Sequence, residues 1–294
     1  MARSASSNCD CDVMPTPPYG SYASIILLVL GSALLSVNIA GLLLDPPSAA
    51  PSLVPKAQQV PGFHYSIGSN AELLRRLSTP DKEFSIEATN DLVAKTIRHV
   101  EDRRLAIYEN PLMWMAGKLY DPLSRTQNPH KIAEGAQGLC SEAALVLTAI
   151  AKLHGVRARL VGLNGHVVSE IETPQGWRVA DPDFGITFPA TVHELEGPAG
   201  PPMIEQALRS KGYDDDAVEH YVKVFQTASD NVVAPIHAPL SPRLAKVEAC
   251  AEWLNWMVPI AFLAVGTLRF RKTQRRRREQ HVSDRRPGSG DAPA

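Results

Sequence analysis

The sequence predicts a mixed α+β domain placed between two membrane-spanning helices. Residues 141–155 carry apolar side chains at helical spacing and stop at Gly155, a residue that commonly ends helices. Residues 156–181 then change to a period of two, interrupted by turn residues, which is typical of antiparallel strands. Two uncharged apolar stretches stand on either side of this central region.

The first apolar stretch predicts a transmembrane helix at residues 21–44. Its length matches the roughly 20 residues that cross the hydrocarbon core of a bilayer. A cleaved signal peptide is the alternative, because Ser48-Ala49-Ala50 resembles a cleavage site. The stretch is long for a signal-peptide core, and the segment before it has little positive charge. We therefore favour an uncleaved helix, preceded by a disordered cytoplasmic tail at residues 1–20.

The second apolar stretch predicts another transmembrane helix at residues 249–268. Its uncharged part, residues 253–268, is short for a span, but it lengthens if Glu252 lies at the lipid headgroups. An amphipathic helix on the membrane surface is the alternative. Arginines crowd the segment that follows, and basic residues beside a span stay in the cytoplasm. We therefore predict a basic cytoplasmic tail at residues 269–294 and, in a bacterium, an inner-membrane protein whose domain faces the periplasm.

The overall charge excludes one class of partner. The formal net charge is −1, which gives no general attraction for nucleic acid. The C-terminal arginines are explained by membrane topology and contact with anionic lipid. Cys9 and Cys11 are too few to predict a metal centre, and no acidic loop has the ligand spacing of a calcium site. We expect no metal and no cofactor.

The central region divides into a linker, a domain and a second linker. Residues 45–62 contain five prolines and predict a stiff, extended spacer. The domain is expected at residues 63–231. Residues 232–248 are expected to form a linker that becomes helical at Ser241-Pro242.

The first part of the domain is expected to be helical. Thr89 and Asn90 are interpreted as the cap of a helix that reaches Val100, and residues 121–135 as a loop leading to the central helix. Further helices are expected at residues 112–120, at residues 203–210 and after Asp214.

Cys140 is the candidate nucleophile. It lies where a turn enters the central helix, and free backbone N–H groups at a helix start favour a thiolate and can hold an oxyanion. In a periplasmic domain it would have no cysteine partner for a disulfide. A small buried apolar residue is the alternative. Gln137 is a possible side-chain donor to the oxyanion, although an ordinary turn glutamine is the simpler interpretation.

His166 and Asp181 are the candidate base and its orienting carboxylate. A two-residue hairpin loop pairs Thr173 with Gly176 and makes His166 and Asp181 diagonal neighbours, with Cβ atoms roughly 7–8 Å apart. A carboxylate can reach an imidazole over that distance and fix its tautomer. A histidine on the strand surface is the alternative for His166, and Asp183 is the alternative for the carboxylate.

These motifs resemble the transglutaminase-like superfamily, which shares the papain-like cysteine-enzyme fold. The resemblance rests on Gly138-Leu139-Cys140 at a helix start, on His166 before an alternating strand, and on the segment Gly176–Pro182. It covers roughly residues 130–185. It implies an α+β core in which the cysteine helix packs on an antiparallel sheet, a triad of Cys140, His166 and Asp181, and a thioester acyl-enzyme.

Two departures from that pattern leave the acyl acceptor open. Animal transglutaminases have Gln-Cys-Trp at the nucleophile, where this chain has Leu139-Cys140-Ser141, and the segment after His166 is less aromatic. We therefore predict a membrane-anchored cysteine acyltransferase or hydrolase that acts on peptide bonds or glutamine carboxamides of a peptide, a protein or a cell-envelope component. A catalytically inactive scaffold that binds a peptide or an envelope polymer is the alternative.

Overall fold

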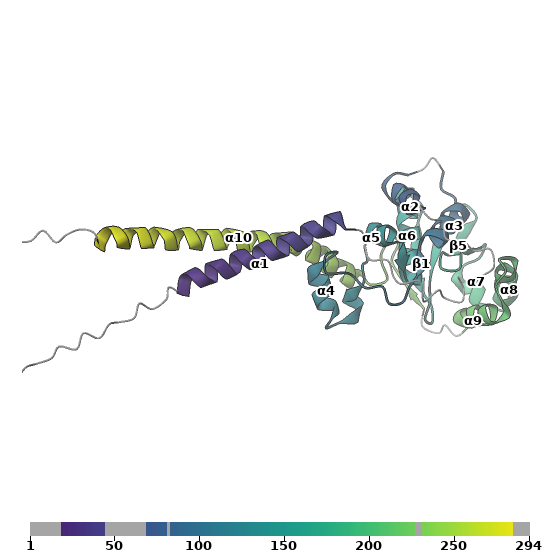
Figure 1. Ribbon diagram of the computed structural model, residues 1–294. Coiled ribbons are helices and arrows are strands. Elements are labelled where there is room, and N and C mark those ends of the chain that lie inside the picture. Colours follow the sequence, from purple (N-terminus) through teal and green to yellow (C-terminus); the bar gives the residue numbers. More distant parts are fainter. Residues whose placement is uncertain (1–18, 45–68, 81–82, 227–230, 285–294) are drawn as a thin grey trace, which may run out of the picture. The chain divides into compact units, whose positions relative to one another are not determined.

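The structure is a computed structural model that describes residues 19–44, 69–80, 83–226 and 231–284 (Figure 1). It contains two compact units. One comprises the chain up to Ser36 together with the chain from Trp256, and the other comprises Val37–Asn255. The predicted linker at residues 45–62 lies outside the described residues, and so does the predicted tail at residues 1–20 except for its last two residues.

The larger unit is built on an antiparallel sheet. Its strands lie in the order β6-β5-β4-β3-β7. Their bounds are β3 Ala158–Gly162, β4 Val167–Thr173, β5 Gly176–Asp181, β6 Ile186–Phe188 and β7 Val232–Val233. Thr173 pairs with Gly176 and Ser169 with Ala180, so the predicted hairpin register is confirmed. In this register, the end of β5 lies beside the beginning of β4.

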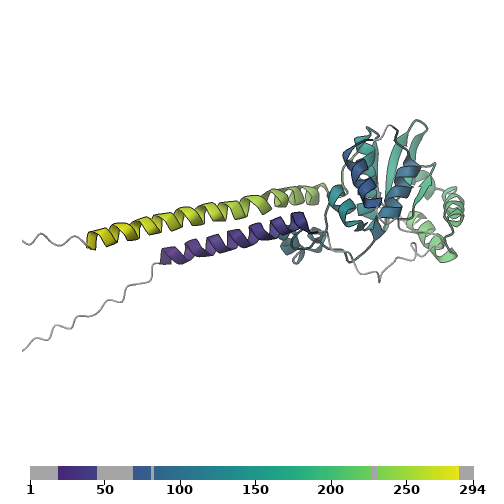
Figure 2. The same cartoon turned by 45° about the horizontal axis from the view of Figure 1, so that its top comes forward.

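Helices cover both faces of this sheet. On one face, α3 (Ile86–Thr96) and α6 (Cys140–Leu153) pack on the strands, and α2 (Ser69–Ser78) and α5 (Pro129–Gly135) pack on α6 in the same apolar core. The other meets α7 (Val192–Glu196), α8 (Gly200–Ser210) and α9 (Asp215–Gln226), which Figure 1 shows gathered together. In Figure 2 the blue helices α2 and α3 lie side by side.

The two apolar cores follow from the alternation along the strands. Leu160 and Ile171 belong to the core under α6, whereas Val161 and Val179 belong to the core under α9. Successive strand residues point to opposite faces, so a strand covered on both sides is apolar at both sets of positions. The sheet is therefore a buried central layer of this unit.

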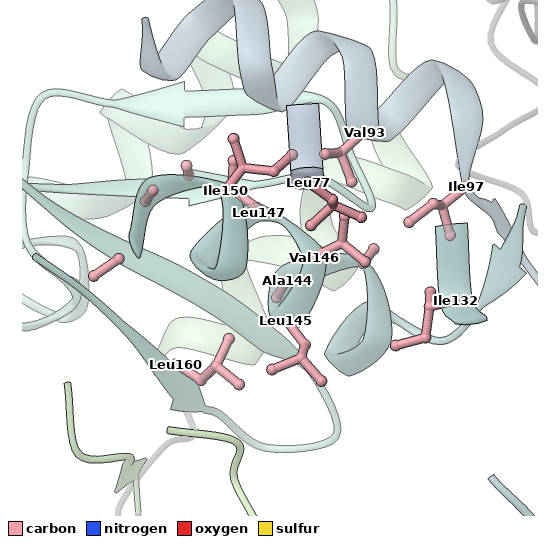
Figure 3. Close-up of a cluster of buried hydrophobic side chains, with 14 of the residues drawn as sticks. Leu77, Val93, Ile97, Ile132, Ala144, Leu145, Val146, Leu147, Ile150 and Leu160 are labelled. Carbon is pink, nitrogen blue, oxygen red and sulfur yellow. The ribbon is translucent and has the colours of Figure 1, made fainter. Parts of the chain in front are cut away.

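Helix α6 is the most deeply packed element around the candidate nucleophile. Val146, Leu147 and Ile150 are fully buried, and they belong to the same apolar cluster as Val93 of α3 and Ile132 of α5, all labelled in Figure 3. Burying one such side chain stabilises a fold by about 1.5–3 kcal/mol. The later turns of α6 are thus held firmly, and they fix the position of its first residue.

The predicted start of the first domain helix is wrong. Helix α3 begins at Ile86, and the Ser85 hydroxyl caps it by accepting from the Ala88 N–H at 3.2 Å. Thr89 and Asn90 are buried inside the helix. The helix also ends before Val100, because residues 98–99 form strand β1 (Arg98–His99), which pairs in parallel with β2 (Gln137–Gly138).

Two segments expected to be irregular contain regular structure. The predicted loop at residues 121–135 holds the 3₁₀ helix η2 (Asp121–Ser124) and α5, which is capped by Asn128. The linker predicted at residues 232–248 begins with β7, so the sheet continues beyond the expected domain boundary at residue 231. Each of these elements is too short to show a periodic pattern. The expected helix at residues 112–120 is α4 (Pro111–Gly117).

Two long apolar helices match the predicted spans. They are α1 (Tyr19–Leu43) and α10 (Pro242–Asp284), and both contain a window long and apolar enough to cross a membrane. Helix α10 is continuous through Pro259 and into the predicted tail at residues 269–294. Within the smaller unit, a Cβ atom on Gly31 would lie 2.9 Å from Leu263 Cγ, so glycine allows the helices to approach closely.

Candidate active site

Cys140 is the first residue of α6, and the structure holds this helix start in several ways. The buried Glu142 carboxylate accepts from the Leu139 N–H at 2.7 Å and lies 3.4 Å from Arg125 Nη1. A Cβ atom on Gly138 would stand 2.8 Å from Glu142 Cβ, so only glycine fits there without displacement. The Cys140 side chain itself is half-buried and forms no disulfide. The thiol is thus positioned by a rigid helix start and still reaches solvent.

His166 lies directly before β4. Its carbonyl accepts from the Leu163 N–H at 2.8 Å, and its side chain is only 9 % exposed. Nε2 lies 2.6 Å from Asp181 Oδ2. The Cys140 thiol lies close enough to this ring to contribute to raising the pKa of His166. Because Asp181 occupies Nε2, Nδ1 is the nitrogen that remains for the thiol.

Asp181 ends β5 and is fully buried. Besides His166, Oδ2 accepts from the Tyr221 hydroxyl at 2.7 Å. Oδ1 accepts from the backbone N–H groups of Asp183 at 2.8 Å and Phe184 at 3.2 Å. A buried carboxylate is stable only when such donors replace its hydration. These contacts therefore satisfy the buried carboxylate and fix where it holds the imidazole.

The electrostatics of this group favour a protonated imidazole. Burial lowers the pKa of His166, but the charge and hydrogen bond of Asp181, together with the Cys140 thiol, raise that pKa well above its usual value. Burial and the Asp181 charge both raise the pKa of Tyr221 well above its usual value. Tyr221 therefore remains a hydroxyl donor at neutral pH.

Aromatic side chains surround the imidazole. Phe184 and Tyr221 meet the His166 ring edge-on, with centroids 5.6 and 5.9 Å away, and they pack on one another at 4.6 Å. Edge-on aromatic contacts restrict the orientation of a ring. They also exclude water from the hydrogen bond between His166 and Asp181.

The structure brings all three predicted site residues together. Cys140 contacts His166, and His166 contacts Asp181, as the hairpin register indicates. Asp183 does not take the orienting position. Its carboxylate oxygens instead lie 2.8 and 2.9 Å from Nδ1 of His99 on β1. Gln137 is buried, with 3 % exposure, which does not suit a donor that must meet a substrate.

Three residues of this group were missed at the sequence level. Tyr221 lies in the helix expected after Asp214, where the sequence marks it only as an apolar position, and Asn90 is predicted to be a helix cap. The Asn90 amide in fact donates to the carbonyls of Asp181 at 3.3 Å and Ile186 at 3.0 Å. His99 was not singled out. All three lie far from Asp181 in the sequence, and no local pattern marks them.

Within the described part of the chain, no group of three or more His, Cys, Asp or Glu residues is placed to hold a metal ion. Searches against protein-family models and against curated proteins find no match to this chain.

Proposed function

We propose that this protein is a membrane-anchored cysteine acyltransferase or hydrolase that cleaves an amide bond through a thioester intermediate. The observation that carries the proposal is the continuous contact from the Cys140 thiol through His166 to a buried, fully hydrogen-bonded Asp181. A nucleophile beside a base, with the base held by a third group, is the arrangement that activates a thiol. A binding scaffold has no need of this combination.

The proposed reaction uses both ring nitrogens of His166, one beside the Cys140 thiol and one beside Asp181. His166 accepts the thiol proton at Nδ1 while Asp181 holds Nε2, and the thiolate then attacks the amide carbonyl carbon. The backbone N–H of Cys140 donates to the oxyanion that forms. His166 returns the proton to the leaving amine, and a thioester remains on Sγ. Water or an acceptor amine resolves this thioester, with His166 as the base.

The fold supports the same assignment. A helix that begins at the nucleophile packs on an antiparallel sheet, in which His166 directly precedes β4 and Asp181 ends β5. This agrees with what the resemblance to the transglutaminase-like superfamily and its papain-like core implies. The same resemblance supports a peptide, a protein or an amide of the cell envelope as the substrate.

Two apolar helices support attachment to a membrane. The arginines near the end of α10 support an orientation in which both ends of the chain lie in the cytoplasm. Basic residues that flank a span stay in the cytoplasm. The domain between the helices therefore faces the periplasm. Reporter fusions after Asn231 and after Ala294 are expected on opposite sides of the membrane, and a cytoplasmic signal from both fusions contradicts this topology.

The catalytic proposal is tested by alkylating the full chain in detergent with an iodoacetamide probe. Peptide mapping is expected to show fast labelling of Cys140 at neutral pH, and labelling slowed in His166→Ala. Cys250→Ala is the matched control, because Cys250 is also a free cysteine and is exposed. If Cys140 reacts no faster in wild type than in His166→Ala between pH 5 and 9, the thiol is not activated and the scaffold alternative is favoured.

A further inference from the structure

His99 forms a second histidine–aspartate pair beside the proposed triad. Its Nδ1 lies 2.8 and 2.9 Å from the two carboxylate oxygens of Asp183. Asp183 is joined to the triad, because its backbone N–H donates to Asp181 Oδ1 at 2.8 Å. The side chains of His99 and Asp183 are only 16 % and 9 % exposed. The two pairs therefore belong to one rigid assembly.

The backbone places His99 next to the segment that leads into the nucleophile. His99 pairs with Gly138 in the parallel contact between β1 and β2, two residues before Cys140. The N–H of Val100 donates to the Gly138 carbonyl at 2.8 Å, which fixes this register. Directly paired residues on neighbouring strands project from the same face of the sheet. The His99 ring therefore lies on the face from which Gly138 approaches the start of α6.

The contact with Asp183 determines which ring atom of His99 is available. Nδ1 is occupied by Asp183, and no other described residue forms a hydrogen bond with Nε2. Nε2 is also not one of the buried polar atoms of the described residues that lack a partner. Burial lowers the pKa of His99, but Asp183 and Glu101 raise it above its usual value against the opposing charge of His166. In the protonated ring, Nε2 is an N–H donor that the contact between Nδ1 and Asp183 leaves available.

We infer that His99 is the side-chain donor of the oxyanion hole, with Asp183 as the residue that positions it. This rests on the proposed function. When Sγ bonds to the substrate carbonyl carbon, the π electrons move to the oxygen, which accepts from the Cys140 N–H and from His99 Nε2. Collapse re-forms the C=O bond and breaks the C–N bond, and the leaving amine takes its proton from His166. His99 keeps its proton throughout.

Two reactions of the same thiol separate this role from a structural one. Alkylation by iodoacetamide displaces iodide and forms no oxyanion, whereas acylation by 4-nitrophenyl acetate passes through a tetrahedral oxyanion. Removing one oxyanion donor slows catalysis by about 10²–10³-fold. In the full chain, His99→Ala is therefore expected to slow the acylation burst about 10²-fold while alkylation of Cys140 continues at close to the wild-type rate.

Further variants sharpen the test. His99→Gln keeps an N–H donor and is expected to recover part of the acylation rate. Asp183→Asn removes the charge that keeps His99 protonated, so its acylation rate is expected to fall at a lower pH than in wild type. His193→Ala, at an exposed histidine on α7, is the matched control and leaves both reactions unchanged.

The outcomes distinguish the two proposals. If His99→Ala slows acylation and alkylation equally, or slows neither, His99 is not the oxyanion donor although the triad still stands. If the wild-type chain is not acylated at Cys140 at all, the proposed function itself fails.

Discussion

Replacing Tyr221 with phenylalanine removes one hydroxyl from the buried network and nothing else. In the structure this hydroxyl donates to Asp181 Oδ2 at 2.7 Å, and both residues are fully buried. A hydrogen bond to a charged group contributes about 1.5–3 kcal/mol to stability. Because 1 kcal/mol shifts Tm by about 2–4 °C in a unit of this size, Tyr221→Phe is expected to lower Tm by roughly 3–12 °C.

The same substitution is expected to change the imidazole. Without the Tyr221 hydroxyl, the Asp181 carboxylate is less satisfied and accepts more strongly from His166, so the pKa of His166 moves further upward. Histidine-selective ¹³C NMR of the full chain in detergent follows this titration, and His166→Gln assigns the signal. Thermal unfolding of the same samples gives Tm.

Tyr213→Phe is the matched control for both measurements. The Tyr213 hydroxyl donates at 2.7 Å to the neutral carbonyl of Phe184, and Tyr213 is also buried. A neutral hydrogen bond contributes only about 0.5–1.5 kcal/mol. The reasoning is refuted if Tyr221→Phe and Tyr213→Phe lower Tm equally, or if Tyr221→Phe leaves the His166 titration at its wild-type pH.

Two further predictions concern pH and the start of α6. Asp181 raises the folded-state pKa of His166 above its unfolded value of about 6.5. The stabilisation of the folded protein by this pair is therefore complete below about pH 6.5, and it is lost as pH rises through the folded-state pKa of His166. Urea unfolding from pH 5.5 to 9 is expected to show this decline in wild type and a flatter profile in His166→Gln. Gly138→Ala forces its new Cβ against Glu142 and is expected to slow alkylation of Cys140, whereas Gly162→Ala, whose Cβ meets only ordinary contacts, is expected to leave it unchanged. Equal labelling rates in the two alanine variants contradict the importance of that close approach.

The parts of the site that sequence alone predicts are those fixed by local rules. Cys140 is marked by the turn that precedes a helical pattern. The contact between His166 and Asp181 follows from strand alternation and a short hairpin loop, because the two residues are only 15 positions apart. Both are consequences of the geometry of neighbouring elements.

The remainder depends on tertiary packing, which local patterns do not encode. Tyr221 reaches Asp181 across 40 positions and Asn90 across 91, and in the sequence they look like an apolar helix position and a helix cap. His99 meets Asp183 across 84 positions, through a two-residue strand that has no detectable period. Short helices such as α5 escape detection for the same reason.

The central claim is that Cys140 forms a thioester with a carbonyl substrate. Mass spectrometry of the full chain, quenched in acid during its reaction with 4-nitrophenyl acetate, tests this most directly. The account predicts one acetyl group on Cys140 that hydroxylamine removes, and no such adduct in Cys140→Ala. Acetylation confined to lysines or to Cys250, with Cys140 unmodified in the wild-type chain, contradicts it.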